Sequence, residues 1–382
     1  MEIKSIEPTP SPNTMKLTLD EHLPQGSSNN YTAKNISEAP SYIKELFEIE
    51  GVKGIYHVAD FLAIERHPKV DWKVILPQVR EVFGEASDEE TNQEVNQAST
   101  EDGFGEVHVF LQMFKGIPMQ IKLTTADQEV REGLPERFSK ASFRVQETAD
   151  NLVMERQWVE QGVRYGDLDE VAKEVAEEVS ASYSDERLER LVSKALQQES
   201  ETDNTNQPRY KKVTLGMLDV PDWKERYAAL EQMDPTEEDL PVLAKALEDE
   251  KASIRRLATV YLGMIEKPVV LTYLYKALKD SSVTVKRTAG DCLSDIGDKD
   301  AIAPMIEALK DNNKLVRWRA AMFLYEVGDE SAINALKKAQ HDPEFEVAMQ
   351  AQMALKRIEG GEEAKGSVWK QMTEQRSKTN EQ

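Results

Sequence analysis

The chain has 382 residues, a formal net charge of −22 and a moderate apolar content, which fits two or three globular domains joined by polar links. The acidic excess lies in the first 240 residues, which carry 48 acidic and 26 basic residues, whereas residues 241–360 carry 18 of each. Because an acidic surface repels a phosphate backbone, this distribution argues against non-specific nucleic-acid binding by the first part of the chain.

Cysteine content and hydropathy exclude further classes of protein. A single cysteine, Cys292, excludes an internal disulfide and any iron–sulfur cluster held by thiolates of this chain alone. No basic stretch followed by an apolar one opens the sequence, and no apolar run approaches the roughly 20 residues of a membrane-spanning helix. We therefore expect a cytoplasmic protein that does not engage a membrane.

Residues 1–84 are predicted to form a small α+β domain. They include the segment EPTPSPNTMKLTL (residues 7–19), which we interpret as a stiff, proline-rich first strand. Apolar spacing then predicts strands at residues 15–19, 55–58 and 61–65 and helices at residues 40–48 and 71–82.

A second α+β domain is predicted at residues 104–197. Strands at 107–111 and 119–123 flank the loop 115–118, which is the pattern of a hairpin, and residues 168–196 have helical spacing. Polar, Ser- and Asn-rich composition predicts disordered segments on either side of this domain and at the end of the chain. These segments are the acidic linker 85–103, the linker 198–208 and the tail 360–382 with its single tryptophan, Trp369.

The clearest signal lies in residues 209–359, where four columns of residues recur every 31 positions. The columns are Asp249, Asp280, Asp311 and Asp342; Ile254, Val285, Val316 and Val347; Ala258, Ala289, Ala320 and Ala351; and Leu262, Leu293, Leu324 and Leu355. A fixed period of this size predicts stacked helical pairs in a solenoid. Each aspartate is predicted to N-cap the second helix of its pair, with Pro343 in a first turn. Residues 223–230 are predicted to cap the array as a degenerate half-unit.

The sequence resembles known families along nearly its whole length. Residues 274–293 and 305–324 follow the L-x-x-A-L-x-D…V-R-x-x-A-x-x-x-L pattern of the short HEAT-type (armadillo-like) repeats found in bilin-lyase-like proteins. The pieces EPTPSPNTMKL, LFEIEGVKGIYHVADFLAIER and VDWKVILPQV resemble the N-terminal domain of Nfu iron–sulfur scaffold proteins. LQMFKGIPMQIKL and ERQWVEQGVRYG resemble the middle domain of the virulence factor C family of Gram-positive bacteria, in which these three parts occur in this order. That resemblance implies two small α+β domains followed by an all-α solenoid, and a link to virulence-factor expression without an established reaction.

Residues with potential chemistry give little support for a cofactor or an enzyme. Nfu scaffolds hold their cluster with a C-x-x-C motif that this sequence lacks, and Cys292 falls in an apolar column with Tyr261 and Phe323, which favours buried packing. The histidines lack the ligand spacing of metal sites, and no nucleophile-elbow, P-loop or dinucleotide-binding motif occurs. We expect no metal, no cofactor and no catalytic residue; a lyase activity rests only on the bilin-lyase likeness of the repeats. The histidines are His22, His57, His67, His108 and His341.

The repeat register also places charged residues in two rows. The first row contains Arg255, Lys286 and Arg317, and the second row contains Arg256, Arg287 and Trp318. Arginine and tryptophan are favoured interface anchors, so these rows are candidate binding sites for an acidic protein partner. Three alternatives remain: each basic residue pairs with the aspartate of a neighbouring repeat, the rows dock on the acidic N-terminal half of the chain, or the rows bind phosphate, for which five or six charges on a neutral array are a weak signal.

These observations favour a non-enzymatic cytoplasmic adaptor that binds protein partners through its solenoid. The alternative is an accessory factor in iron–sulfur cluster assembly or delivery, which acts through the Nfu-like domain and carries no cluster ligands of its own.

Overall fold

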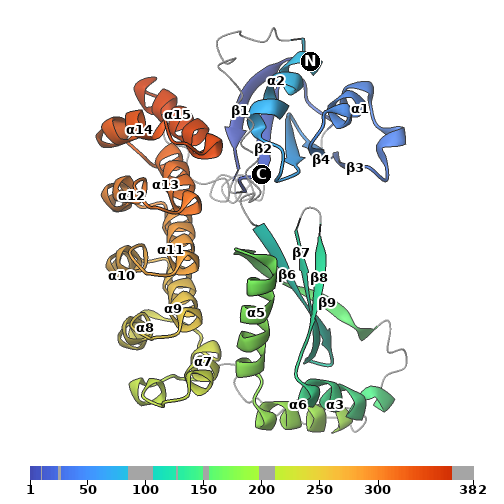
Figure 1. Ribbon diagram of the computed structural model, residues 1–382, viewed down its shortest axis with the longest axis vertical. Coiled ribbons are helices and arrows are strands. Elements are labelled where there is room, and N and C mark those ends of the chain that lie inside the picture. The colour runs from blue at the N-terminus through green and yellow to red at the C-terminus, as the bar shows by residue number, and fades with distance from the viewer. Residues whose placement is uncertain are drawn as a thin grey trace, which may run out of the picture. The chain divides into compact units, whose positions relative to one another are not determined.

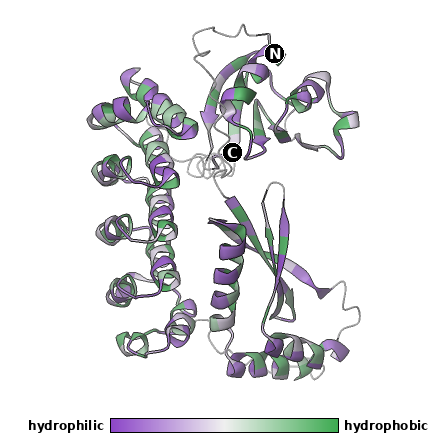
Figure 2. Cartoon of the chain, in the orientation of Figure 1, coloured by the Kyte–Doolittle hydropathy of each residue, from purple (hydrophilic) through white to green (hydrophobic). Residues whose placement is uncertain are grey.

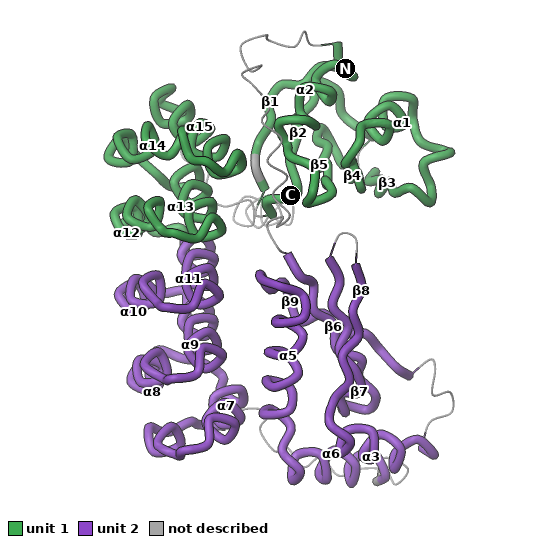
Figure 3. Tube along the Cα trace, viewed as in Figure 1, with its two compact units in different colours: residues 1–104, 297–382 green, residues 105–296 purple. Residues whose placement is uncertain are grey.

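The computed structural model describes residues 1–9, 11–24, 27–84, 106–125, 128–148, 155–197 and 211–363 (Figure 1). They belong to two compact units, which are Met1–Phe104 with Gly297–Gln382, and Gly105–Ile296 (Figure 3). Each unit combines one α+β domain with part of the helical array, so the predicted fold class is confirmed. The predicted linkers at 85–103 and 198–208, and the tail from residue 364 with Trp369, lie outside the described residues.

The first α+β domain is an antiparallel sheet with helices packed on it. The strands are β1 (Ile3–Pro8), β2 (Thr14–Leu19), β3 (Ser28–Thr32), β4 (Val52–Val58) and β5 (Phe61–Arg66), in the spatial order β1-β2-β5-β4-β3. The 3-10 turn η1 (Ile36–Glu38) precedes helix α1 (Ser41–Glu48), and helix α2 (Trp72–Val82) follows the last strand. Leu17, Leu62 and Ile64 of the sheet form one buried core with Ile43 of α1 and Ile75 of α2. The alternation and the helical spacing in the sequence both arise from this core.

The proline-rich segment forms a turn and not the stiff strand expected from the sequence. Strand β1 ends at Pro8 and β2 starts at Thr14, and Thr9 Oγ1 donates a hydrogen bond to the carbonyl of Thr14 at 2.9 Å. The buried indole of Trp72 donates from Nε1 to the carbonyl of Pro12 at 2.9 Å. Because proline has no N–H for a strand ladder, Pro12 suits this connection, which Trp72 fixes onto α2.

The second α+β domain is an antiparallel sheet with helices on one face. Its strands are β6 (Glu106–Phe114), β7 (Ile117–Thr124), β8 (Glu129–Gly133) and β9 (Gln157–Tyr165), in the order β8-β7-β6-β9. The helices are α3 (Glu136–Arg144), α5 (Leu168–Ser182) and α6 (Asp185–Gln197), with the 3-10 turn η3 (Gln146–Thr148) after α3. Alternate residues of β6, such as Val107 and Val109, pack with Phe138 of α3, Val175 of α5 and Val192 of α6.

Two boundaries in this domain differ from the sequence prediction. The hairpin turn consists of Lys115 and Gly116 alone, whose φ angles of 47° and 80° suit a two-residue turn that matches strand twist, so the following residues already belong to β7. The predicted helix at 168–196 is broken after α5, because Ser184 starts a new helix: its Oγ accepts a hydrogen bond from the backbone N–H of Arg187 at 3.3 Å.

The repeats are pairs of helices of period 31. Their first helices are α8 (Leu240–Ala246), α10 (Leu271–Ala277), α12 (Ile302–Ala308) and α14 (Ile333–Ala339), preceded by the 3-10 turns η5 (Glu237–Asp239), η6 (Pro268–Val270), η7 (Lys299–Ala301) and η8 (Glu330–Ala332). Their second helices are α9 (Ala252–Ile265), α11 (Val283–Ile296), α13 (Lys314–Glu326) and α15 (Phe345–Glu359). The turn η4 (Leu215–Leu218) and helix α7 (Trp223–Glu231) precede them, and α7 contacts α9.

The recurring apolar columns form the core of the repeats. All twelve residues of the Ile/Val, Ala and Leu columns are buried. Apolar and polar residues alternate along the paired helices in Figure 2, as expected for helices with one buried face. No helix in the described ranges is both long and apolar enough to cross a lipid bilayer.

Candidate functional site: the arginine rows of the repeats

Each of the two first-row arginines joins its own repeat to the following one. In α9, Arg255 donates from Nε and Nη2 to the two carboxylate oxygens of Asp280 at 2.7 and 2.8 Å, and from Nη1 to the carbonyl of Asp249 at 2.8 Å. In the other unit, Arg317 of α13 donates to Asp342 in the same way, at 2.7 and 2.9 Å. Such two-pronged, charge-assisted hydrogen bonds fix orientation as well as distance. These contacts are the ones expected if each basic residue of the first row pairs with the aspartate of a neighbouring repeat.

A further pair of the same kind precedes these two. Arg226 of α7 donates from Nε and Nη2 to Asp249 at 2.7 and 3.0 Å. Arg226 falls outside the repeat register, because it precedes its aspartate by 23 residues, whereas Arg255 and Arg317 precede theirs by 25. We call these three pairs, Arg226–Asp249, Arg255–Asp280 and Arg317–Asp342, the arginine ladder. Lys286 holds the corresponding position in α11.

The repeat aspartates cap the turn before each second helix and not the helix itself. Asp311 Oδ1 accepts from the backbone N–H of Asn313 at 2.8 Å, and Asn313 is the N-cap of α13, with its own side chain accepting from Leu315 N at 2.9 Å. Asp249, Asp280 and Asp342 likewise accept from the residue two positions on, at 2.9, 2.7 and 2.9 Å. Each carboxylate therefore orders its own turn, and in the ladder it also receives an arginine.

The second row is engaged within the unit 105–296 by the middle domain. Glu178 of α5 is only 4% exposed and accepts hydrogen bonds from Arg164 of β9 at 2.7 Å and from Arg256 of α9 at 3.4 Å. Burial alone would raise the pKa of Glu178, but the guanidinium groups of Arg256 and Arg164 outweigh it and hold that pKa below its usual range. Glu178 is thus a buried carboxylate shared by its own domain and the repeats.

Arg287, the next member of this row, contacts the same domain. From α11 it donates from Nη2 to the hydroxyl of Tyr165 at 3.0 Å and lies over the tyrosine ring, 4.6 Å from its centroid. It also forms an ion pair with Asp291 one turn along α11. Burial raises the pKa of Tyr165 to about 12, so the phenol stays neutral at physiological pH. The contact combines a hydrogen bond with a cation–π interaction.

More exposed polar contacts surround this region. Lys251 at the start of α9 pairs with Glu177 of α5 at 2.8 Å, and Ser253 donates to Glu174 at 3.3 Å. The exposed Lys251–Glu177 pair is worth little, whereas Ser253 is buried; the buried ion pair of Glu178 with Arg256 is the one that costs most to break.

Trp318, the last second-row residue, is not a surface anchor in the unit that contains it, because it is 2% exposed. In this same unit α15 packs against the Nfu-like domain. Arg66 of β5 and Glu346 of α15 form a buried ion pair at 2.7 Å, and Phe345 and Met349 of α15 pack against the core of that domain. Arg66 also donates to the carbonyl of Val70 at 2.9 Å.

Cys292, His57 and His108 each contact neighbouring groups of the protein. Cys292 is buried as predicted, with its thiol 3.5 Å from the carbonyl of Thr259. His57 is buried and shares a hydrogen bond of 3.0 Å with the Tyr42 hydroxyl, and His108 lies 3.4 Å from Glu160. Within the described ranges, no three His, Cys, Asp or Glu side chains come together in a group that could hold a metal ion.

Three family models match the chain in the order predicted from the sequence. They are the N-terminal domain of Nfu/NifU scaffold proteins at residues 3–90, virulence factor at 112–192 and HEAT repeats at 271–356. Conserved virulence factor C of Staphylococcus aureus (strain USA300) is 53% identical over 375 residues, which cover 97% of this chain and 99% of that protein. This chain belongs to the conserved virulence factor C family.

A second full-length relative and a shorter solved structure are also similar to this chain. The protein YpgR of Bacillus subtilis (strain 168) is 66% identical over 378 residues, which cover 99% of this chain and all of that protein. The crystal structure of protein SAV1430 from Staphylococcus aureus is 41% identical and covers 22% of this chain and 99% of that chain, with a TM-score of 0.21.

The sequence analysis did not identify the residues that meet the second row. Glu178 lies 78 positions before Arg256, and Tyr165 lies 122 positions before Arg287. No local pattern marks one carboxylate among 70 as the partner of a distant arginine. The signal available was the helical spacing of α5, which places Glu178 on the same stripe as the buried residues Val171 and Val175.

Proposed function

We propose that this member of the conserved virulence factor C family is a non-enzymatic cytoplasmic adaptor. Its HEAT-type repeats bind protein partners, and its Nfu-like and middle domains provide further recognition surfaces. The name of the staphylococcal relatives supports a link between this binding and virulence-factor expression. Binding by complementary surfaces, without covalent chemistry, accounts for such a role.

The observation that carries this proposal is the way the repeats hold α5. Within residues 105–296 the second row already engages the middle domain through a buried carboxylate, Glu178 of helix α5, and an aromatic hydroxyl, Tyr165 of strand β9. These are the chemical groups expected on an acidic protein partner of the same row. A surface that binds one such helix within the chain has the chemistry to bind a similar one from outside.

A partner at the second row would compete with α5. Arg256 and Arg287 cannot serve both at once, because each guanidinium is buried against the middle domain in the present arrangement. The first row is also engaged, since Arg255 and Arg317 are held by ladder aspartates. The six candidate residues thus remain a proposed partner site, in which Arg256 and Arg287 become available only when the middle domain releases them.

Chemical cross-linking in living cells, followed by mass spectrometry, tests the adaptor role. We expect the lysines of the repeats to form cross-links to one or a few other proteins in reproducible amounts. A cross-link map confined to this chain, under conditions in which known complexes of the same cells are captured, would contradict the proposal.

A second candidate function rests on the match of residues 3–90 to Nfu/NifU N-terminal domains. In this role the Nfu-like domain contacts scaffold or client proteins, and another protein carries the cluster. Iron and sulfide assays on anaerobically purified protein, alone and with an added thiol, distinguish the two roles. Stoichiometric iron and sulfide would favour cluster handling, and their absence together with captured non-cluster partners would favour the adaptor.

A further inference from the structure

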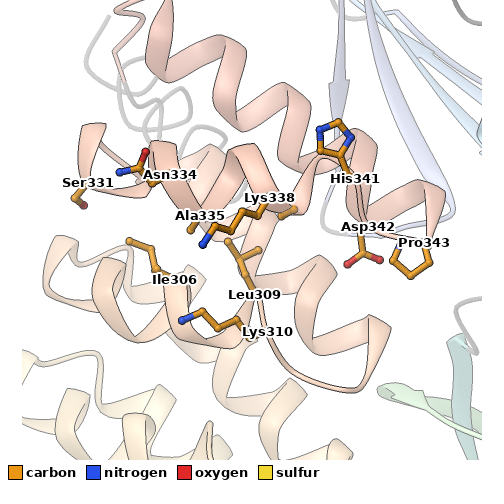
Figure 4. A pocket seen from close by; sticks show the side chains of 11 residues that line it. Ile306, Leu309, Lys310, Ser331, Asn334, Ala335, Lys338, His341, Asp342 and Pro343 are labelled. Atoms are coloured by element: carbon orange, nitrogen blue, oxygen red, sulfur yellow. The ribbon is translucent and has the colours of Figure 1, made fainter.

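A groove lies between α12 and α14, and the carboxylate at its edge, Asp342, is the one that Arg317 of the first row already holds. It has a volume of about 470 Å³. Its floor is apolar, formed by Ile306, Leu309 and Ala335, and Lys310 and Lys338 extend along it (Figure 4). The whole groove belongs to one compact unit.

Within the described ranges, one of the two lysines along the groove forms an ion pair and the other does not. Lys310 pairs with Glu307 on its own helical turn at 2.9 Å, and both side chains are exposed. Lys338 has no carboxylate within ion-pair distance among the residues that the structure describes. Its neighbour Lys337 points elsewhere and pairs with Glu359 at 2.8 Å.

An earlier repeat shows how the same position can be neutralised. Two periods before Lys338 stands Lys276 of α10, and two periods before Lys310 stands Glu248 after α8. Lys276 and Glu248 form an ion pair at 2.6 Å. One period before the groove these two positions hold Lys279 and Glu307, again one cation and one anion, whereas Lys310 and Lys338 are both cations.

We propose that the groove between α12 and α14 binds a peptide segment of a protein partner that combines a carboxylate with a neighbouring apolar side chain. The carboxylate takes the position that Glu248 fills in the earlier repeat and meets Lys338 and Lys310. The apolar side chain lies on Ile306, Leu309 and Ala335, where burial drives binding. This inference builds on the proposed adaptor function, for which it supplies a partner surface whose lining residues all lie in the unit that does not contain α5.

Selection of a displayed library of short random peptides on the full chain tests this proposal, with affinities of the enriched peptides measured by fluorescence anisotropy. We expect enriched peptides to share an acidic residue beside an apolar one. Lys338→Glu should weaken their binding by about tenfold or more. Lys310→Glu should weaken peptide binding as well, because the new glutamate pairs with Lys338 as Glu248 pairs with Lys276. We expect this variant to fold, because it copies an ion pair that an earlier repeat already contains. Lys337→Glu on the same helix is the matched control and should bind as the original does.

Two results would overturn the groove proposal. One is enrichment of peptides that bind Lys338→Glu and Lys310→Glu as tightly as the original; the other is no enrichment of acidic, apolar peptides at all. Neither result bears on the cross-linking test of the adaptor role, because that test detects partners at any surface of the chain.

Discussion

Arg255 in one repeat donates two hydrogen bonds to the carboxylate of Asp280 in the next, at 2.7 and 2.8 Å. Its remaining nitrogen donates to the carbonyls of Asp249 and Glu250 in its own repeat. One side chain therefore satisfies the turn of its own repeat and holds the turn of the following one. This explains why an aspartate recurs every 31 residues in a sequence whose other recurring columns are apolar.

Asp280→Asn is expected to lower the free energy of unfolding by about 2 kcal/mol, because it removes the negative charge that two Arg255 hydrogen bonds address. Urea denaturation followed by far-ultraviolet circular dichroism measures this loss. Asp300→Asn, at an exposed position, serves as the control and should shift the midpoint little. If Asp280→Asn has the same urea midpoint as Asp300→Asn and the original protein, the ladder does not stabilise the repeats.

Glu178→Gln is expected to lower the free energy of unfolding by about 3 kcal/mol at pH 7, because it leaves the guanidinium groups of Arg164 and Arg256 buried without their shared anion. Hydrogen–deuterium exchange should show faster exchange in α5 and in the facing part of α9. Glu177→Gln, next to it in sequence and 52% exposed, should change both measurements little.

The contribution of Glu178 should also depend on pH with a definite sign. The pKa of Glu178 in the folded protein lies below its usual range, so its contribution is fully present above the unfolded-state pKa of about 4.3 and is lost as pH falls through the folded-state value. The difference in urea midpoint between the original and Glu178→Gln should therefore be constant near neutral pH and shrink below about pH 4. A difference that grows on acidification would contradict the assignment of a buried, ionised Glu178.

Gly263→Ala tests the packing between α9 and α11. A methyl group at Gly263 would overlap Cys292 Sγ and lie 2.9 Å from Cys292 Cβ, so we expect a loss of about 1–3 kcal/mol despite the better helix propensity of alanine. Adding Cys292→Ala should restore part of this loss, and the two changes should be non-additive in a double-mutant cycle. Gly216→Ala, where a methyl group meets no atom within 4 Å, is the control. Additive effects would show that Gly263 is not constrained by Cys292.

Glu346→Gln tests how α15 holds the Nfu-like domain. Because Arg66 and Glu346 are both buried, we expect the substitution to lower stability by about 3 kcal/mol and to speed exchange in α2 and α15. Glu344→Gln, two residues earlier and in a longer 3.6 Å pair with Lys314, should have a much smaller effect. If amide hydrogens of α2 and α15 exchange at the original rate in both variants, the packing of α15 on the Nfu-like domain does not depend on this ion pair.

The sequence predicted the repeats well and the contacts between domains poorly, for physical reasons. Ile254, Ala258 and Leu262 are buried in one core at helical spacing. Because equivalent positions are buried in each repeat, apolar residues recur every 31 positions and the repeats can be recognised from the sequence. Arg66 and Glu346 are 280 positions apart, and among the described residues their ion pair is not repeated at a fixed spacing, so no sequence pattern predicts it. The basic rows were found from register, but whether they face a partner, a neighbouring aspartate or α5 depends on tertiary structure.

The central claim is that the repeats are a protein-binding surface in which α5 of the middle domain occupies Arg256 of the second row. Quantitative affinity capture from native cells, comparing the original chain with Glu178→Gln and with Glu177→Gln, tests it most directly. The account predicts specific partners whose captured amount rises in Glu178→Gln, because the loss of the shared anion makes α5 dissociate from Arg256 more often, and stays unchanged in Glu177→Gln. Capture of the same partners in the same amounts by all three proteins, or of none above an untagged control, would contradict it.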